Sequence, residues 1–122
     1  MTINEAISAA DGLRNNQIAE EIKRAMLSEL DGRIYREVID PCGSDFGGYT
    51  AETDGEAKLI VPYPYDGLYV TYLEMEIARM GAEMPRYNNA AIVFNEKYSA
   101  FKRWYNRTHP RSSVRIVFPT RR

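Results

Sequence analysis

Six side chains between residues 87 and 105 recur with spacings that alternate between four and three residues. They are Tyr87, Ala91, Phe94, Tyr98, Phe101 and Tyr105. This spacing places all six on one stripe of a single helix, because residues three and four apart share a helical face. Such bulky side chains need a partner surface, and the nearest is a preceding apolar stretch that contains Tyr69, Tyr72 and Leu73. The sequence therefore predicts a helical hairpin packed across these residues. We call the six side chains between residues 87 and 105 the aromatic seam.

Tyrosine and phenylalanine at this spacing are far more often core packing than a platform on which bases stack. Buried tyrosine hydroxyls then need hydrogen-bond partners. Asn88 and Asn89, in the first turn of the second helix of the hairpin, are candidates for that role, with local capping as the alternative. The basic residues between seam positions are expected to lie on the solvated face of this helix.

Prolines and glycines mark the ends of the hairpin. Pro64 suits the first turn of the earlier helix, where its fixed φ and missing N–H are tolerated. Gly81 is expected to end that helix, and Pro85 to open the next one after a short turn. His109, the only histidine, precedes a proline and marks the end of the second helix.

The amino terminus begins with a helix-capping pattern. Thr2 is expected to cap a helix, and Glu5 to bond back to the backbone N–H of Thr2. Gly12 is a plausible stop for this helix. Its apolar positions fall on one face: Ile3, Ala6, Ile7 and Ala10.

A second helix is expected to begin at a cap on Asn15 or Asn16 and to continue to about Ile39. Gly32 lies inside it, where glycine is about 1 kcal/mol less favourable than alanine, which leaves a bend or a break there as an alternative to a continuous helix. Asp40 precedes a proline, which ends the helix. The apolar positions recur at every fourth residue: Ile22, Met26, Leu30, Ile34 and Val38.

Residues 41–58 contain four glycines and few apolar side chains. A loop of this length is uncommon in a compact domain and is usually functional or mobile. Its turn signals leave a short β-hairpin as an alternative. Residues 59–61 are then either a brief strand or an apolar segment that anchors the loop. Residues 114–118 are β-prone and too short to form a sheet alone.

These patterns predict an all-α domain of four helices over residues 1–110, with a long glycine-rich loop between the second and third helices. An extended, basic tail follows over residues 111–122. The 122 residues suffice for one domain. No apolar run approaches the roughly twenty residues that span a membrane, and the amino terminus lacks a signal-peptide pattern. The chain is therefore expected to be soluble and intracellular when made.

Net charge is near zero but unevenly distributed. Residues 1–96 hold all seventeen acids and only eight of the sixteen lysines and arginines. The other eight bases lie in an acid-free end: Lys97, Lys102, Arg103, Arg107, Arg111, Arg115, Arg121 and Arg122. Such asymmetry suggests a nucleic-acid surface, an acidic protein partner or head-to-tail contact between copies, with a solvated tail as the alternative. The residues expected to dock on a partner, in part by adding a strand to an exposed sheet edge, are Arg111, Val114, Arg115, Ile116, Val117 and Phe118.

No pattern points to catalysis, a cofactor or a metal. Cys42, a lone cysteine that excludes an internal disulfide, has no histidine or helix start nearby to lower its thiol pKa. One cysteine and one histidine far apart are a poor beginning for a metal site. The glycine-rich run over residues 43–48 lacks the G-K-[ST] ending of a phosphate loop. The loop acids lack the regular spacing of a calcium site: Asp45, Asp54 and Glu56.

Four strings carry a resemblance to a known family. They are P-x-P-Y-D-x-L-Y-x-x-Y-L at residues 62–73, E-x-x-R-Y-N-N-x-A at 83–91, W-Y-N-R-T-H at 104–109, and the segment LSELDGRIYREVI at 27–39. In these strings the chain resembles the head–tail connector, or head-completion adaptor, proteins of tailed bacteriophages and prophages. About half of the chain is covered strongly, and the tail is not.

The resemblance implies a small α-helical virion protein that docks as a ring, typically of twelve subunits, on the phage portal protein. Such a ring extends the DNA channel, through which DNA passes without specific contacts, towards a downstream connector or tail protein. The resemblance also implies that the subunit forms this ring in the virion and is monomeric until it meets the portal. A small nucleic-acid-binding regulator that uses the basic last helix and tail is the alternative. An enzyme is the least favoured hypothesis.

Overall fold

The computed structural model describes residues 1–13, 15–41 and 46–109. Its elements, in chain order, are α1 (Ile3–Leu13), α2 (Glu20–Ile34), the π-helical turn η1 (Tyr35–Ile39), α3 (Gly67–Met80) and α4 (Met84–Thr108). Within these ranges there is no β-strand, and a single isolated antiparallel bridge joins Thr2 to Lys58. The prediction of an all-α domain built on four helices, with a long loop before the third, is confirmed.

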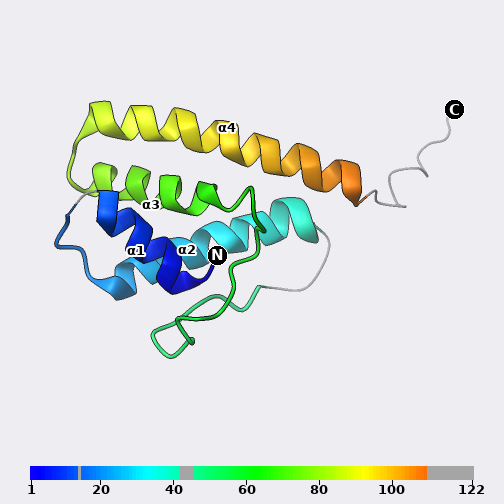
Figure 1. Ribbon diagram of the computed structural model, residues 1–122, viewed down its shortest axis with the longest axis horizontal. Helices are drawn as coiled ribbons and strands as arrows, with labels where there is room; N and C mark the ends of the chain where they lie inside the picture. Colours follow the sequence, from blue (N-terminus) through cyan, green and yellow to red (C-terminus); the bar gives the residue numbers. More distant parts are fainter. Residues whose placement is uncertain (14, 42–45, 110–122) are drawn as a thin grey trace, which may run out of the picture.

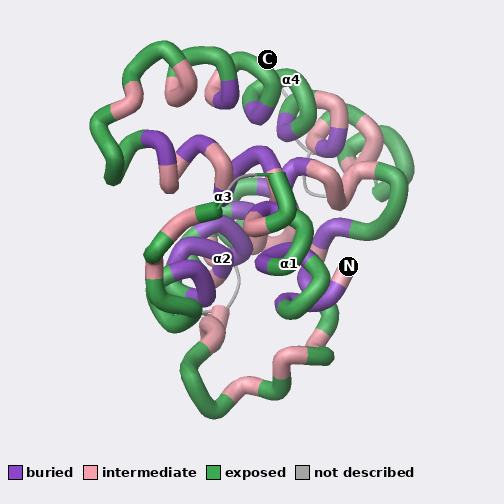
Figure 2. The backbone as a smooth tube through the Cα atoms, turned by 60° about the vertical axis from the view of Figure 1, so that its left-hand side comes forward, coloured by how far each residue is buried: buried purple, intermediate pink, exposed green. Residues whose placement is uncertain are grey.

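Helix α3 is the central element, since it packs against α1, α2 and α4. Figure 1 shows α3 and α4 as an antiparallel hairpin, with α1 and α2 on the opposite side of α3. The loop between η1 and α3 runs along the outside of α1 and α2 before it enters α3. Buried residues gather where these helices face one another, while the outer side of α4 is exposed (Figure 2).

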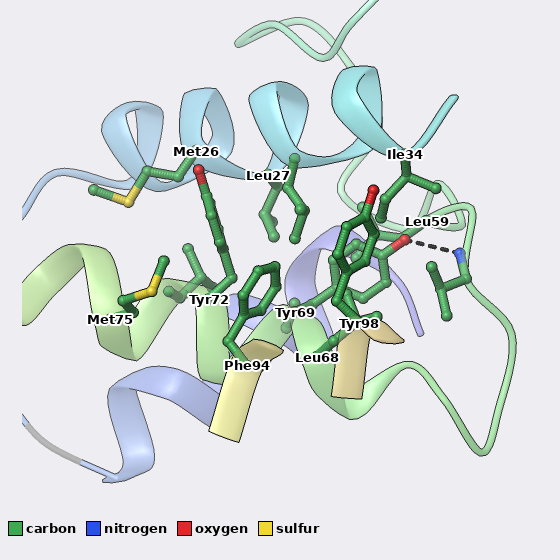
Figure 3. Packing of buried hydrophobic residues seen from close by; sticks show 14 of the residues in the cluster. Met26, Leu27, Ile34, Leu59, Leu68, Tyr69, Tyr72, Met75, Phe94 and Tyr98 are labelled. Atoms are coloured by element: carbon green, nitrogen blue, oxygen red, sulfur yellow. Dashed lines mark hydrogen bonds between the residues drawn. The ribbon is translucent and has the colours of Figure 1, made fainter. Parts of the chain in front are cut away.

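The core draws on every helix. Ile3 and Ala6 of α1, Leu27 and Leu30 of α2 and Leu73 of α3 are 1% exposed or less. Figure 3 shows Tyr69, Tyr72, Phe94 and Tyr98 filling the space between α2 and the α3–α4 hairpin, with the hydroxyls of Tyr72 and Tyr98 pointing towards α2. The periodicities of α1, α3 and α4 therefore point into one shared core rather than into a separate hairpin interface.

The predicted capping pattern of α1 is confirmed. The Thr2 N–H donates to Glu5 Oε1 at 2.9 Å, and the Glu5 N–H donates to Thr2 Oγ1 at 3.1 Å. The bond from the Thr2 backbone lowers the pKa of Glu5. The helix runs through Gly12 and ends at Leu13, one residue past the expected stop.

The predicted start of the second helix is wrong. Asn16 uses its side chain locally, because its Oδ1 accepts the Ile18 N–H at 3.1 Å and its Nδ2 donates to Asp11 Oδ1 at 3.1 Å. The helix instead begins at Glu20, after an Ala19 that offers no side-chain cap. Ile22, expected on the apolar face, is 41% exposed.

The carboxyl end of the second helix follows the prediction more closely. The chain stays helical past Gly32 and changes to the wider π geometry of η1, which ends at Ile39 just before Asp40. The helix has no break at Gly32. The wider turn still buries Val38, at 1% exposure.

The two helices of the hairpin begin and end partly where the sequence predicts. Pro64 lies outside α3, which begins three residues later at Gly67, and the Tyr63–Pro64 bond is cis. Gly81 is the C-cap of α3, and α4 begins at Met84 with Pro85 in its first turn. His109 follows the last residue of α4 as its C-cap.

Candidate functional site

The aromatic seam of α4 lies partly in the core and partly at the boundary between the core and the surface. Phe94, Tyr98 and Phe101 are buried. Tyr87, Ala91 and Tyr105 are only half-buried against the same core. From α3, the structure places Tyr69, Tyr72 and Leu73 in the core as well. Tyr72 meets the ring of Phe94 at 5.3 Å, and Phe94 stacks on Tyr98 at 5.7 Å.

Carboxylates of α2 and η1, rather than asparagines, satisfy the tyrosine hydroxyls. Tyr72 donates to Glu29 at 2.9 Å, and Tyr98 donates to Glu37 at 2.7 Å. The expectation that Asn88 and Asn89 would serve these hydroxyls is wrong, because both lie on the exposed side of α4. The hydrogen bond from Tyr98 lowers the pKa of Glu37.

Asp31 is the least expected residue of the core. It is 0% exposed and accepts three hydrogen bonds. The Tyr69 hydroxyl donates to Oδ1 at 2.6 Å, and the Tyr49 hydroxyl and Ile60 N–H donate to Oδ2 at 2.5 and 3.1 Å. Tyr69 in turn accepts the Val61 N–H at 2.8 Å (Figure 3). One carboxyl group thus joins α2, the loop and α3.

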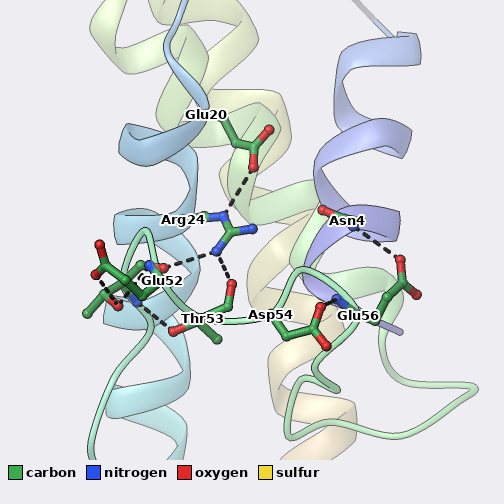
Figure 4. A network of polar contacts seen from close by, with 8 residues as sticks. Asn4, Glu20, Arg24, Glu52, Thr53, Asp54 and Glu56 are labelled. Atoms are coloured by element: carbon green, nitrogen blue, oxygen red, sulfur yellow. Dashed lines mark hydrogen bonds and ion pairs between the residues drawn. The ribbon is translucent and has the colours of Figure 1, made fainter.

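The described part of the long loop is held at both ends. Arg24 donates from Nη1 to the carbonyls of Thr50 and Thr53 at 3.0 and 2.6 Å, while its Nε reaches Glu20 at 3.2 Å (Figure 4). The N–H groups of Ile3 and Asn4 donate to loop carbonyls at 3.2 and 2.9 Å. Residues 59–61 act as the apolar anchor, and the alternative hairpin does not form over residues 46–58.

Folding raises the pKa of Asp31, because removal of its carboxylate from water outweighs the three hydrogen bonds. Such a group stabilises the fold most below its unfolded-state pKa, about 3.9, and that contribution is lost as pH rises through the higher folded-state value. We expect the unfolding free energy of the wild type, relative to Asp31→Asn, to decrease between about pH 4 and pH 7. Urea unfolding of both proteins across this pH range measures the difference in their free energies of unfolding. The contributions of the other carboxyl groups are common to both proteins and cancel in this difference. A difference that grows with pH would contradict the assignment.

The carboxyl-terminal half of α4 carries positive charge and no acid. Lys97, Arg103 and Arg107 are exposed, and none of them forms an ion pair with another described residue. Lys102 is half-buried, with its ammonium 5.3 Å from the centre of the Tyr98 ring. No acid lies between Lys97 and His109. We call Lys97, Lys102, Arg103 and Arg107 the basic end of α4.

Aromatic contacts fix this end of α4 against the segment that enters α3. Trp104 packs on Tyr65 at 5.2 Å and on Phe101 at 6.1 Å. The imidazole of His109 stacks on the Tyr105 ring at 4.1 Å, and its Nδ1 lies 3.2 Å from the Tyr105 carbonyl oxygen. His109 therefore closes the helix, and packed rings hold the last turn of α4 in place.

The residues weighed for chemistry at the sequence level are not brought together. His109 lies beside aromatic rings at the end of α4, whereas Asp54 and Glu56 lie in the loop against α1. Over the described ranges, no three histidine, cysteine, aspartate or glutamate side chains are grouped as metal ligands would be. Cys42 and Asp45 lie outside the described residues, as do the docking residues Arg111, Val114, Arg115, Ile116, Val117 and Phe118.

None of the helices in the described ranges combines the length and the apolar character needed to cross a membrane. Comparison with protein-family models, with curated proteins and with solved structures found no match to this chain.

Proposed function

We propose that this chain is a head–tail connector subunit of a tailed bacteriophage or prophage. It is made in the bacterial cytoplasm and acts in the virion, as part of a ring that docks on the portal and extends the DNA channel. Its partners are the portal protein, the next connector or tail protein, and further copies of itself. The proposal carries no reaction, cofactor or metal.

The basic end of α4 is the observation that carries this proposal. Three exposed cations there have no ion pair among the described residues, and the tail that follows adds four arginines and no acid. Residues 1–96 hold all seventeen acids. Subunits with opposite charge on two surfaces are suited to a contact that repeats around a ring, because one surface meets the other on the next copy.

The family resemblance adds support, because its strings coincide with contacts that define this fold. They contain both partners of the Asp31–Tyr69 hydrogen bond and both rings of the Tyr65–Trp104 contact. The string at residues 83–91 covers the tight turn into α4 and its first two turns. A related sequence that keeps these residues has the means to build the same helical arrangement.

Deleting residues 111–122 should abolish co-purification of the chain with the portal protein encoded in the same genome. The reason is that the tail supplies the contact with the portal or with the neighbouring subunit, and a ring seated on a portal needs both. The measurement is affinity capture of the portal, followed by quantification of the bound subunit. Removing only residues 121–122 is the control, because it shortens the tail but keeps the docking residues.

Unchanged capture after the full deletion would contradict the docking role of the tail. A second measurement separates the connector from the nucleic-acid-binding regulator. The isolated connector is expected to bind DNA weakly, whereas a regulator binds tightly, with an affinity that falls steeply between low and moderate salt. Tight and strongly salt-dependent binding by the isolated chain, without portal capture, would favour the regulator.

A further inference from the structure

An apolar groove lies at the end of the molecule opposite to the basic end of α4. Two adjoining hollows of about 330 and 310 Å³ meet at Met80. We call their apolar lining the Met80 groove: Ile18, Ile22, Ala25, Met26, Ile77 and Met80. Ile22 and Met80 are 41% and 47% exposed, which is unusual for large apolar side chains that adjoin one another.

The rim of the Met80 groove is acidic. Glu29, Glu76 and Glu83 line it, together with Arg79 and Arg86. Each arginine pairs with one of these acids: Arg79 lies 2.7 Å from Glu76, and Arg86 lies 3.1 Å from Glu83 and 3.8 Å from Glu74. The charges within each pair cancel, and Glu29 gives the rim its net negative charge. A ligand for this groove should therefore combine apolar side chains with positive charge.

The tail of this chain has that composition. Val114, Ile116 and Phe118 alternate with Arg115 and Val117, and the tail contains no acid. An extended segment projects alternate side chains to opposite sides. Bound in the groove, the tail would direct its three alternating apolar side chains towards Met80. Arg115 would then be free to interact with the acids of the rim.

The tail of the same molecule cannot reach the groove. Helix α4 has 25 residues, which at 1.5 Å per residue places its two ends about 37 Å apart. The groove is lined by residues on both sides of the turn from α3 to α4, and His109 is the C-cap at the other end of α4. Figure 1 shows these two ends of α4 on opposite sides of the molecule. Val114 follows His109 by five residues and Phe118 by nine, so even fully extended they reach only about 18 and 32 Å.

We propose that the Met80 groove receives the segment Val114–Phe118 of a second copy of this chain. The contact is head-to-tail, so that each copy offers one groove and one tail. Repeated with a closing rotation it forms a ring, and without closure it forms a filament. This inference rests on the proposed function in part, since it names the contact between neighbouring subunits of the ring.

Disulfide trapping between two variants tests the contact. In a Cys42→Ser background, chains carrying Met80→Cys are mixed with tagged chains carrying Phe118→Cys in a glutathione redox buffer. We expect the tagged–untagged dimer to form several-fold more than in the control mixture, in which Ala9→Cys replaces Met80→Cys. Ala9 is exposed on α1 and does not line the groove. Equal yields in the two mixtures would overturn the inference.

A charge variant tests the role of the rim. Adding Arg115→Glu to the Phe118→Cys chain should lower the trapped yield several-fold, whereas Arg115→Lys should retain most of it, because the rim is acidic. An unchanged yield with Arg115→Glu would also contradict the inference. Portal capture is scored separately: if capture persists while trapping fails, this contact is wrong and the connector proposal stands. If trapping succeeds without capture, the contact stands and the connector proposal fails.

Discussion

Replacing Asp31 with alanine should lower the free energy of unfolding by about 3–5 kcal/mol. The variant leaves the buried Tyr69 hydroxyl, the Tyr49 hydroxyl and the Ile60 N–H without their common acceptor. Release of the desolvated carboxylate offsets part of this loss, so the effect is smaller than a sum of three bonds to a charged group. Chemical denaturation at pH 7 measures it.

Glu29→Ala is the matched control for Asp31→Ala. It also removes a carboxylate of α2 that accepts a tyrosine hydroxyl, at 2.9 Å from Tyr72. Glu29 is exposed, and water can replace it, so the expected loss is about 1 kcal/mol or less. Similar losses in the two variants would show that Asp31 does not act as the shared buried acceptor.

The helices were predictable because their signals are local. The Thr2–Glu5 capping pair, Gly81, Pro85 and the spacing of the aromatic seam each depend on residues within one or two turns. Where two local signals competed, the prediction failed. Asn16 could cap a helix or close a turn on Ile18, and the turn prevails because Asp11 also takes its side-chain amide.

The contacts that join the helices were not predictable from local spacing. Asp31 is 18 residues from Tyr49, 29 from Ile60 and 38 from Tyr69. On its own helix it looks like one more acid of a solvated face. The available signal was its position directly after Leu30 and four residues after Leu27, which places it at the edge of the apolar stripe.

Of the two interaction surfaces, one could be predicted from the sequence and the other could not. The charge of the basic end of α4 could be counted from the sequence, because an acid-free run is a property of composition. The Met80 groove could not be predicted from the sequence, since it forms where the connector before α2 meets the end of α3. The four-residue spacing places Ile22 on the core face, whereas Ile22 lies in the first turn of α2 and is 41% exposed.

Truncating Phe101 to alanine should lower the free energy of unfolding by about 3–5 kcal/mol, comparable to the loss at Asp31. Phe101 is 1% exposed and contacts the rings of Tyr65, Trp104 and Tyr105 at 6.3, 6.1 and 5.9 Å. Removing it opens a cavity between the last turns of α4 and the segment that enters α3. Thermal and urea unfolding measure the loss.

Ile92→Ala is the control for Phe101→Ala on the same helix. Ile92 is 61% exposed, so its truncation should change stability by about 0.5 kcal/mol or less. Because Phe101 also supports Trp104, the larger truncation should loosen the end of α4 from which the tail departs. Hydrogen exchange over residues 101–108 should therefore accelerate more than exchange in α1. Uniform acceleration across both helices would instead show that Phe101 stabilises the whole core without a particular role in orienting the basic end of α4.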